Sequence, residues 1–417
     1  MDFYIKTILL FGLIVQFSQS EEIFVQTDTL KLATITLSKN YCKAITENKQ
    51  LCKSKKLNYI DYKDTDLPDF LEGLKTHISP SIKAYQDEKL KASTLLDINE
   101  SDGEITGEWY NETSIELAAK TPTTYTLSHT YSGYTGGAHG YYGVSFKNYY
   151  IQSQKELTLK DLFLADFNQP LLHIARSHYK RTHGLKEKQS LTDEGWFEDK
   201  FELAKEFAIT TQGIYFVYNQ YEIKSYASGI TTFMLPYYKL HSIINPKGPL
   251  HFVLKNPHTF HTSFYEKENS FIDIKTKRNT NNSITITASM KNLSYLSQAW
   301  FSLSFPQIHN KKQILKMQKQ GFSSLQSYSK GSKIYHNQYK KAVRSSYLLV
   351  EASNKNWNND KVHTVILTLN VPKQSKELIV DIRSTLKYKH KSIMLPNEDE
   401  GVKGQQGFKN YRIFIGL

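Results

Sequence analysis

The sequence predicts an α+β N-terminal half followed by an all-β C-terminal domain of the immunoglobulin-like sandwich type. Three observations lead to this fold class. The length of 417 residues exceeds what a single hydrophobic core usually organises. Helical and strand patterns are mixed up to about residue 245, whereas the hydrophobic period becomes two after residue 250. Two prolines and a glycine within residues 245–249 separate these parts and indicate a domain boundary.

Residues 1–20 have the pattern of a secretory signal. Lys6 precedes an apolar run over residues 7–17, and small residues stand at Ser18 and Ser20, just before Glu21. The run is much shorter than the roughly 20 apolar residues that span a bilayer. We therefore expect cleavage after Ser20 and an exported protein, periplasmic or extracellular, with no transmembrane segment in the mature chain.

The sequence contains only two cysteines, Cys42 and Cys52. Export places them where disulfides persist, and two thiols with no histidine between them are too few ligands for zinc. We expect a disulfide that stabilises the fold by about 3 kcal/mol in the chain-entropy model. No CxxC motif is present to give this bond a redox role.

Helical and strand patterns alternate in the N-terminal half. Leu71, Leu74 and Ile78 lie at helical spacing and predict a helix over residues 66–92, which Pro80 is expected to kink. Two further helices are expected at residues 159–181 and 194–207. Strands are expected at residues 104–111, 123–131, 144–152 and 213–218. We divide this half into an α+β domain of residues 21–145 and a subdomain of residues 146–247.

Residues 251–417 are expected to form a separate β-sandwich. Ile284, Ile286, Ala288 and Met290 alternate with polar residues, which is the period of a half-buried strand. The other expected strands are residues 271–275, 299–305, 346–352, 364–371, 378–386 and 411–415, with one helical insertion near 311–320. About seven strands in about 165 residues are typical of an immunoglobulin-like sandwich, a fold that assigns no function by itself.

The charge balance favours acidic partners. Lys and Arg outnumber Asp and Glu by 53 to 40, which gives a net charge of +13. Such a surface attracts anionic lipid headgroups, wall polymers or nucleic acid, and export argues against nucleic acid. The alternative is that the lysines only solvate the surface, since no block of five or six like charges marks a basic tail.

No catalytic or metal-binding constellation is recognisable in the sequence. His173, His178 and His183 are five residues apart in an expected helix, so successive histidines point about 140° apart. His258 and His261 would lie on opposite faces of a strand. Neither a G-x-S-x-G elbow nor a phosphate-binding loop is present. The sequence favours a protein without catalysis, cofactor or metal, although a carboxylate pair could exist without a motif to mark it.

Residues 129–143 form the most distinctive local pattern, with five glycines among tyrosines. Gly136 and Gly137 let the backbone take positive φ or approach a ligand closely. Tyr134 and His139 beside them offer aromatic faces with polar tips. Tyr, Ser and Gly together are also typical of antibody paratopes. Two interpretations stay open, a ligand-binding loop and a turn whose tyrosines pack on a sheet.

Further blocks follow this loop in a recognisable order: GGAHG at residues 136–140, Asn148, LTLKDLF at 157–163, residues 207–218, YEIKSYASG at 221–229 and residues 233–240. In order and approximate spacing they resemble the RsiV-type extracytoplasmic domain of lysozyme-sensing anti-sigma factors. A similar module precedes the catalytic domain of PdaC-type peptidoglycan deacetylases. The resemblance covers about residues 45–245.

The resemblance implies an extracytoplasmic binding module, which in the anti-sigma factors captures lysozyme. The chain shows no sigma-binding part and no deacetylase domain, so neither of those activities carries over. Asn148 is followed by Tyr-Tyr-Ile where the family often has an acidic residue, so the role of that acid is lost. Common lysozymes are basic, and a chain with a charge of +13 opposes their encounter.

We therefore expect a secreted or periplasmic non-catalytic protein that recognises a cell-wall glycan or an envelope protein. The alternatives are a cell-wall-active hydrolase with an unrecognised carboxylate site and an inhibitor that binds a lysozyme-type muramidase. In the expected ligand site, aromatic or polar side chains stand beside glycines that free the backbone. Its members are Tyr134, Gly136, Gly137, His139, Tyr221, Glu222, Tyr226 and Gly229. The competing interpretation is that these residues only build turns.

Overall fold

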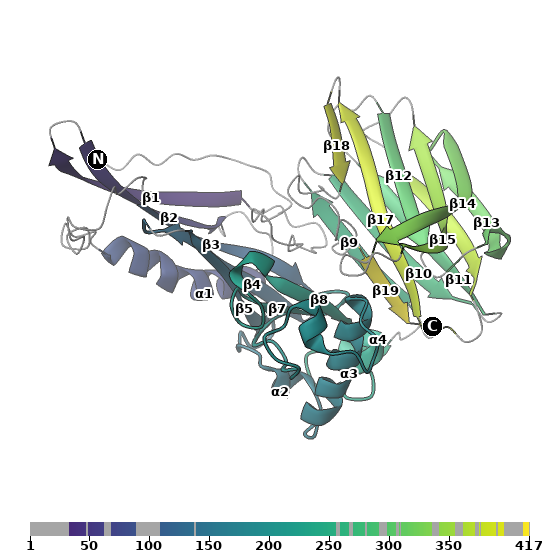
Figure 1. Cartoon of the computed structure of the whole chain (residues 1–417), viewed down its shortest axis with the longest axis horizontal. Coiled ribbons are helices and arrows are strands. Elements are labelled where there is room, and N and C mark those ends of the chain that lie inside the picture. Colours follow the sequence, from purple (N-terminus) through teal and green to yellow (C-terminus); the bar gives the residue numbers. More distant parts are fainter. Residues whose placement is uncertain are drawn as a thin grey trace.

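The computed structural model has an N-terminal half that contains β1 to β8 and a C-terminal β-sandwich that contains β9 to β19 (Figure 1). The residues that it describes are 33–46, 49–61, 68–88, 109–136, 139–255, 259–266, 270–279, 282–291, 298–305, 308, 310–335, 342–354, 362–371, 375, 377–388, 391–395 and 412–416. The expected signal segment lies outside these residues. Within them, no helix is long and apolar enough to cross a membrane.

The first sheet has five strands in the order of the chain, and one helix covers one of its faces. The strands are β1 (Ala33–Thr46), β2 (Lys49–Asp61), β3 (Trp109–Lys120), β4 (Thr124–Tyr134) and β5 (Tyr141–Tyr150). Only the β2–β3 pair is parallel. Helix α1 (Pro68–Asp87) confirms the expected helix and continues through Pro80. Its Leu74 and Ile78 are fully buried in a cluster with Ile115 and Leu127 of the sheet.

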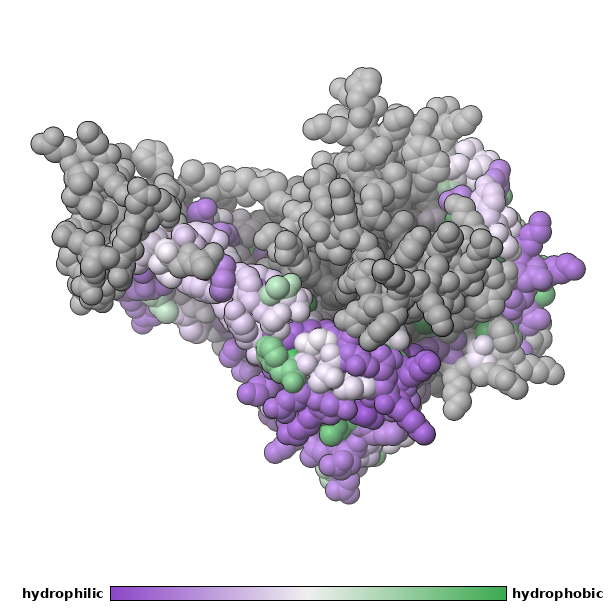
Figure 2. Space-filling view, in the orientation of Figure 1, coloured by the Kyte–Doolittle hydropathy of each residue, from purple (hydrophilic) through white to green (hydrophobic). Residues whose placement is uncertain are grey.

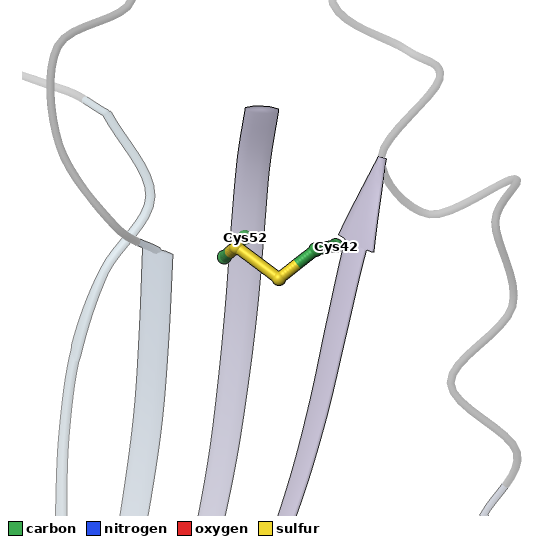
Figure 3. Close-up of a disulfide and its surroundings, with 2 residues drawn as sticks. All are labelled: Cys42 and Cys52. Carbon is green, nitrogen blue, oxygen red and sulfur yellow. A yellow bond between two sulfur atoms is a disulfide. The ribbon is translucent and has the colours of Figure 1, made fainter. Parts of the chain in front are cut away.

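The β1–β2 hairpin carries the expected disulfide. Cys42 and Cys52 stand directly opposite each other in the strand register, and their sulfur atoms are bonded (Figure 3). Farther along the hairpin, Lys39 donates hydrogen bonds from Nζ to backbone carbonyls at the C-terminal end of α1, including that of Glu88 at 2.7 Å. Lys55 forms an ion pair with the Glu88 side chain. The disulfide therefore cross-links the two strands of the hairpin, and the two lysines attach the hairpin to α1.

The second part of the N-terminal half packs helices against a small antiparallel sheet. Its elements are α2 (Leu159–Leu162), α3 (Asn168–Thr182), β6 (Glu206–Ile209), β7 (Gly213–Tyr218), β8 (Thr231–Pro236), α4 (Tyr237–Leu240) and α5 (His251–Lys255). Leu171 and Tyr179 of α3 are buried against Phe216 of β7 and Phe233 of β8. The strand expected at residues 213–218 is confirmed.

Asn148 joins the two sheets of the N-terminal half. This side chain on β5 is almost completely buried, with 2% of its surface exposed. Its Nδ2 donates to the carbonyl oxygen of Phe207 at 2.8 Å, and its Oδ1 accepts from the backbone nitrogen of Ile209 at 2.9 Å. Because β5 runs from Tyr141 to Tyr150, it also crosses the domain boundary that we expected at residue 145.

Two helical expectations in this half are corrected. Residues 194–207 are not a helix: the 3-10 turn Leu191–Glu194 ends at Gly195, whose φ of 93° suits glycine, and irregular chain follows up to β6. Buried Trp196 and Phe201, which pack against Tyr179, gave this stretch an apolar pattern without a helix. The helix expected at residues 159–181 is two helices, α2 and α3.

The C-terminal domain is a sandwich of two sheets, and every strand pair described in them is antiparallel. One contains β13 (Ile314–Gln320), β16 (His363–Asn370), β11 (Ser283–Lys291), β10 (Ser270–Arg278) and β9 (Thr259–Glu266), in that order. The other contains β14 (Ser324–Tyr335), β15 (Ala342–Asn354), β12 (Gln298–Phe305), β17 (Glu377–Tyr388) and β18 (Lys391–Leu395), with β19 (Arg412–Gly416) also paired to β17. Ile286 and Leu367 of the first sheet and Leu303 and Val350 of the second share one buried core.

The expected helical insertion at residues 311–320 is wrong. Lys311–Gln313 form a 3-10 turn, and β13 follows. The register of β13 on β16 shifts between Ile314 and Lys316. This bulge turns both Ile314 and Met317 toward the core, so two inward residues lie three apart. That spacing is typical of a helix and explains the error.

A buried carboxylate joins the two halves of the chain. Glu377 at the start of β17 is 4% exposed and forms an ion pair with Arg181 of α3. The Nη2 atom of Arg181 donates to Glu377 Oε2 at 2.9 Å, and the hydroxyl of Tyr238 on α4 donates to the same oxygen. We call this group of three residues the Glu377 joint.

Candidate functional site

The two sequence blocks expected to form a ligand site lie against each other. The His139 ring stacks on the Tyr226 ring, with centroids 3.9 Å apart and planes inclined by 24°. The Tyr226 hydroxyl donates to the carbonyl oxygen of Gly140 at 2.8 Å. The β4–β5 loop and the β7–β8 connection, 87 positions apart at these two rings, therefore form one surface.

The β7–β8 connection is held against the edge of β5. Asn219 Oδ1 accepts from the backbone nitrogen of Val144 at 2.8 Å, and its Nδ2 donates to the Val144 carbonyl oxygen at 2.9 Å. The backbone nitrogen of Glu222 donates to the Asn219 carbonyl oxygen at 3.2 Å. The 3-10 turn Tyr226–Ser228 then ends at Gly229, whose φ is 68°. These bonds set the position from which Tyr226 reaches the β4–β5 loop.

Tyr221 is the most exposed aromatic residue of this surface. Its side chain is 59% exposed, and its ring centroid lies 5.8 Å from that of Tyr226. Its φ of 64° is in the left-handed region, which is costly for a residue with a Cβ. A bulky residue thus occupies a position that suits glycine, as is common where backbone strain serves a site.

The glycines of the β4–β5 hairpin make room for tyrosine rings. A Cβ at Gly133 would overlap the Tyr141 ring, and a Cβ at Gly143 would overlap the Tyr131 ring. Gly136 has a φ of 88° and lies against the Trp109 ring. These contacts fit the interpretation of a turn whose aromatic residues pack on the sheet, and the ligand-binding interpretation stays a prediction. Gly137 lies outside the described residues, and Tyr134 pairs in register with Tyr110 at the strand ends.

The structure adds three exposed aromatic residues to the expected set. Tyr131 and Tyr141, which lie on the hairpin, are 42% and 39% exposed. Phe197 is 56% exposed, and its backbone nitrogen donates to the carbonyl oxygen of Ile223 at 2.9 Å, beside Tyr221. We call Tyr131, His139, Tyr141, Phe197, Tyr221 and Tyr226 the aromatic surface. Phe197 was missed because it falls in the stretch wrongly expected to be helical.

Two carboxylates, Glu206 and Glu222, influence pKa values on this surface. Burial raises the pKa of Glu222 above its ordinary value, and the charge of Glu206 adds to the increase. Burial also raises the pKa of Tyr131, with smaller contributions from Glu222 and Glu206. The Oε2 atom of Glu206 accepts from the backbone nitrogen of Phe146 at 2.8 Å. The surface therefore combines aromatic faces with hydrogen-bond acceptors.

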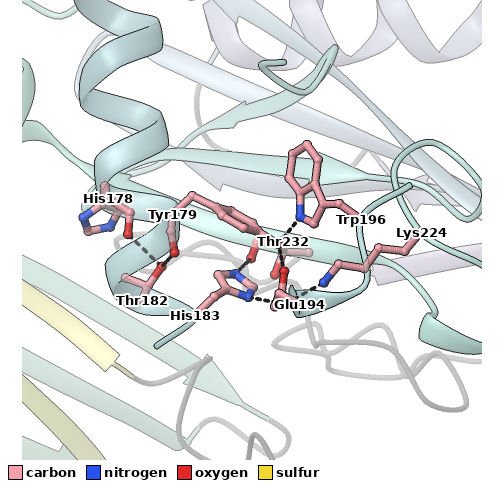
Figure 4. Close-up of polar contacts among 8 residues, drawn as sticks. All are labelled: His178, Tyr179, Thr182, His183, Glu194, Trp196, Lys224 and Thr232. Atoms are coloured by element: carbon pink, nitrogen blue, oxygen red, sulfur yellow. Dashed lines mark hydrogen bonds and ion pairs between the residues drawn. The ribbon is translucent and has the colours of Figure 1, made fainter. Parts of the chain in front are cut away.

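A second polar group is centred on Glu194, whose side chain is 19% exposed (Figure 4). Glu194 receives hydrogen bonds from the Tyr179 hydroxyl at 2.5 Å, Lys224 Nζ at 2.6 Å and His183 Nδ1 at 2.9 Å. Trp196 Nε1 donates to the same Tyr179 hydroxyl at 2.9 Å. Burial alone would raise the pKa of Glu194, but the bonds and charges of His183 and Lys224 outweigh it and lower the pKa to about 2.

The two histidines of this region differ in their hydrogen-bond partners. Both ring nitrogens of His183 face acceptors, Glu194 Oε1 at 2.9 Å and the Thr232 carbonyl oxygen at 3.3 Å, an arrangement that favours the protonated ring. His178 Nε2 donates to the Met234 carbonyl oxygen at 2.7 Å, whereas its Nδ1 accepts from Arg181 at 3.0 Å. Burial, reinforced by Arg181, holds the pKa of His178 well below its usual value.

The histidines singled out in the sequence do not converge on a common centre. His173 is exposed, and His178 and His183 bond to the separate partners described above. His258 lies outside the described residues, and His261 belongs to β9. Within the described part of the chain, no three His, Cys, Asp or Glu side chains are grouped so that they could hold a metal ion.

Residues 160–238 match the family model described as protein of unknown function (DUF3298). These residues carry the DUF3298 sequence pattern. The DUF3298 match includes α3, β6 to β8, the Glu194 group and residues 221–229, but it ends before the sandwich and does not include the β4–β5 loop. A search of curated proteins finds no match.

Two solved structures of DUF3298 proteins are similar to this chain. One is a DUF3298 family member from Bacteroides fragilis, with 18% identity and a TM-score of 0.44, covering 54% of this chain and 98% of that one. The other is a DUF3298 family protein from Pseudomonas aeruginosa, with 19% identity and a TM-score of 0.38, covering 52% of this chain and 95% of that one.

Proposed function

We propose that this is an exported, non-catalytic protein of the bacterial cell envelope whose aromatic surface binds a cell-wall glycan. The contact of His139 with Tyr226, beside exposed Tyr221, carries the proposal. Sugar rings present apolar faces that pack on aromatic rings, and their hydroxyls donate to acceptors such as Glu222. Export rests on the signal pattern of residues 1–20 and on the resemblance to RsiV-type and PdaC-type proteins. An immunoglobulin-like sandwich would then serve as a spacer or second contact.

An envelope protein such as a lysozyme-type muramidase is the alternative ligand. Electrostatic repulsion of a basic partner is weaker than the net charge of +13 for the whole chain suggests. Residues 1–250 contain 27 Lys and Arg against 30 Asp and Glu. A basic protein would therefore meet a slightly acidic N-terminal half. Protein interfaces also use exposed tyrosines as anchors.

A cell-wall hydrolase is a second candidate function because two carboxylates act on the aromatic surface. The raised pKa of Glu222 would favour a carboxylic acid that donates a proton, and Glu206 would be the second carboxylate of the pair. Glu222→Gln and Glu206→Gln separate the two functions. If the protein is a hydrolase, either substitution abolishes its release of soluble wall fragments. If it is a binding protein, neither the wild type nor the variants release fragments.

Tyrosine truncation tests the binding proposal. Tyr221→Ala and Tyr226→Ala are compared with Tyr328→Ala, an exposed tyrosine of the sandwich. Calorimetric titration with soluble peptidoglycan fragments should show at least about thirtyfold weaker binding for the first two variants, since aromatic anchors commonly cost about 2 kcal/mol or more. The melting temperature of Tyr221→Ala should stay unchanged because the side chain is exposed.

Two outcomes contradict the proposal. Unchanged fragment binding by both variants would make these tyrosines structural. Binding of the wild type to a purified muramidase, with no binding of wall fragments, would assign the surface to a protein ligand.

A further inference from the structure

The positive charge of the chain is concentrated in the sandwich. Residues 251–417 contain 26 Lys and Arg against 10 Asp and Glu, whereas residues 1–250 contain 27 against 30. The sandwich therefore carries a formal charge of +16 and the rest of the chain −3. The excess of positive charge therefore belongs to one domain and is separate from the aromatic surface.

One end of the β13–β16–β11–β10 sheet gathers exposed cations. Arg278 lies at the end of β10 and pairs in register with the start of β11. The start of β11 pairs with the end of β16, and the end of β16 pairs with the start of β13. The 3-10 turn Lys311–Gln313 leads into β13 at this same end. The exposed side chains here are Lys277, Arg278, Lys311, Lys312 and Lys316, which we call the basic end. Figure 2 shows strongly hydrophilic side chains along the β13 side of the sandwich.

The outer face next to the basic end presents hydroxyl groups between lysines. Ile284 and Ile286 of β11 point into the core, so Thr285 and its neighbours at alternate positions point outward. Lys277, Thr285, Thr368 and Lys316 are successive register partners across four strands. The hydroxyls of Thr285 and Thr368 lie 3.2 Å apart and Asn279 Nδ2 donates to Thr285 Oγ1 at 3.0 Å, so one threonine donates to the other and the pair keeps one hydroxyl proton for a ligand.

The dimensions of this row suit a chain laid across the strands. Neighbouring strands are about 4.8 Å apart, so the backbones of Lys277 and Lys316 are separated by about 14 Å. Ammonium groups and hydroxyls both donate to phosphate oxygens, and the ionic contacts are the stronger. Lys275, two residues before Lys277 on β10, is also exposed on this outer face, so the cations continue from the basic end along β10.

We propose that the basic end and its Thr285–Thr368 pair form a binding site for a linear phosphate-bearing polymer of the cell envelope. Charge complementarity supports the polymer, and the row of donors supports a ligand in direct contact along the sheet. A bilayer surface needs only the long-range field of the cations and makes no use of half-buried hydroxyls. The site does not depend on the glycan proposal, since it shares no residue with the aromatic surface.

The test uses the mature full-length protein and long-chain inorganic polyphosphate. A triple variant, Lys277→Gln, Lys312→Gln and Lys316→Gln, removes three cations of the basic end. Its matched control, Lys83→Gln, Lys186→Gln and Lys188→Gln, removes three exposed cations of the N-terminal half. A third variant, Thr285→Val with Thr368→Val, keeps the charge and removes the two hydroxyls.

Fluorescence anisotropy over a range of salt concentrations should separate local contacts from overall charge. We expect the basic-end triple variant to bind polyphosphate at least tenfold more weakly than the control triple variant. Each lost phosphate contact lowers the slope of log K against log salt by about 0.7 for a single-stranded polyanion, so the slope should fall by about 2. The threonine variant should bind more weakly with an unchanged slope.

Three results would overturn the proposal. Equal weakening in both triple variants would assign binding to the general field of the chain. Binding to phosphatidylglycerol vesicles, with none to polyphosphate, would make the basic end a lipid contact. If the wild type binds neither probe, the cations of the basic end serve only to solvate the surface. Circular dichroism melting of each variant confirms that the fold is retained.

Discussion

Glu194 should make the stability of the N-terminal half depend on pH. Its pKa is lowered from the ordinary value of 4.5 to about 2 in the folded protein. The difference of roughly 2.5 pKa units corresponds to about 3 kcal/mol, at about 1.4 kcal/mol per unit. The side chain is only 19% exposed, so solvent screening removes little of this contribution.

The sign follows from the direction of the shift. A carboxylate whose pKa is lower in the folded state stabilises that state fully above its unfolded pKa, here about 4.5. The contribution is lost as the pH falls from about 5 to about 2. The variant Glu194→Gln has no such titration, and at pH 7 it leaves buried Lys224 and His183 without their anion, which costs about 3–5 kcal/mol.

Native-state hydrogen exchange of the β7 amides, corrected for the intrinsic exchange rate at each pH, measures the local free energy of opening. Wild type should lose about 3 kcal/mol between pH 5 and pH 2 beyond the loss in Glu194→Gln. Glu187→Gln is the control, because Glu187 is 57% exposed and pairs with Arg176 at the surface. An equal loss in wild type and Glu194→Gln would refute the role given to Glu194.

Four further predictions follow from the fold and the sequence. Tyr221→Gly should raise the unfolding free energy by about 1 kcal/mol in a denaturant titration, because it relieves a φ of 64°; no gain would mean that the ring packing compensates. Replacing Cys42 and Cys52 by serine should lower stability by about 3 kcal/mol, and free thiols in the native protein would argue against the bond. Residues 251–417 should give a cooperative melt on their own, and a gradual transition would contradict a separate domain. N-terminal sequencing of the native protein should start at or near Glu21, and an intact Met1 would exclude the expected cleavage.

Most regular elements could be predicted where one periodicity dominates. The strand at residues 213–218 and the alternation of Ile284, Ile286, Ala288 and Met290 follow directly from a half-buried sheet. Residues 311–320 failed because a bulge imitates helical spacing, and 194–207 failed because buried aromatic residues in irregular chain have no period. The β1 and β2 strands were not expected, since the apolar alternation of this lysine-rich hairpin is weak.

The members of the candidate site could be anticipated, but its geometry could not. Glycines beside aromatic residues marked both blocks, yet nothing in the sequence states that His139 stacks on Tyr226. Glu194, His183 and Lys224 have no motif spacing that would reveal their contact, because residues distant in the chain form it. Phe197 joins the surface through a backbone bond, which side-chain patterns do not encode.

The Glu377 joint affects how tightly the protein would bind a surface that presents two ligands. A flexible linker lets the second binding site move through a volume that grows with linker length, which lowers the effective concentration of that site. Here the buried carboxylate, bonded to Arg181 and Tyr238, links the two halves directly and so restrains their relative motion. If both proposed ligands bind, a wall that presents them at a separation matching the two sites would be bound with an avidity above either affinity. If the ligands were spaced differently, only one half could bind, so binding would depend on the spacing of the polymers in the wall.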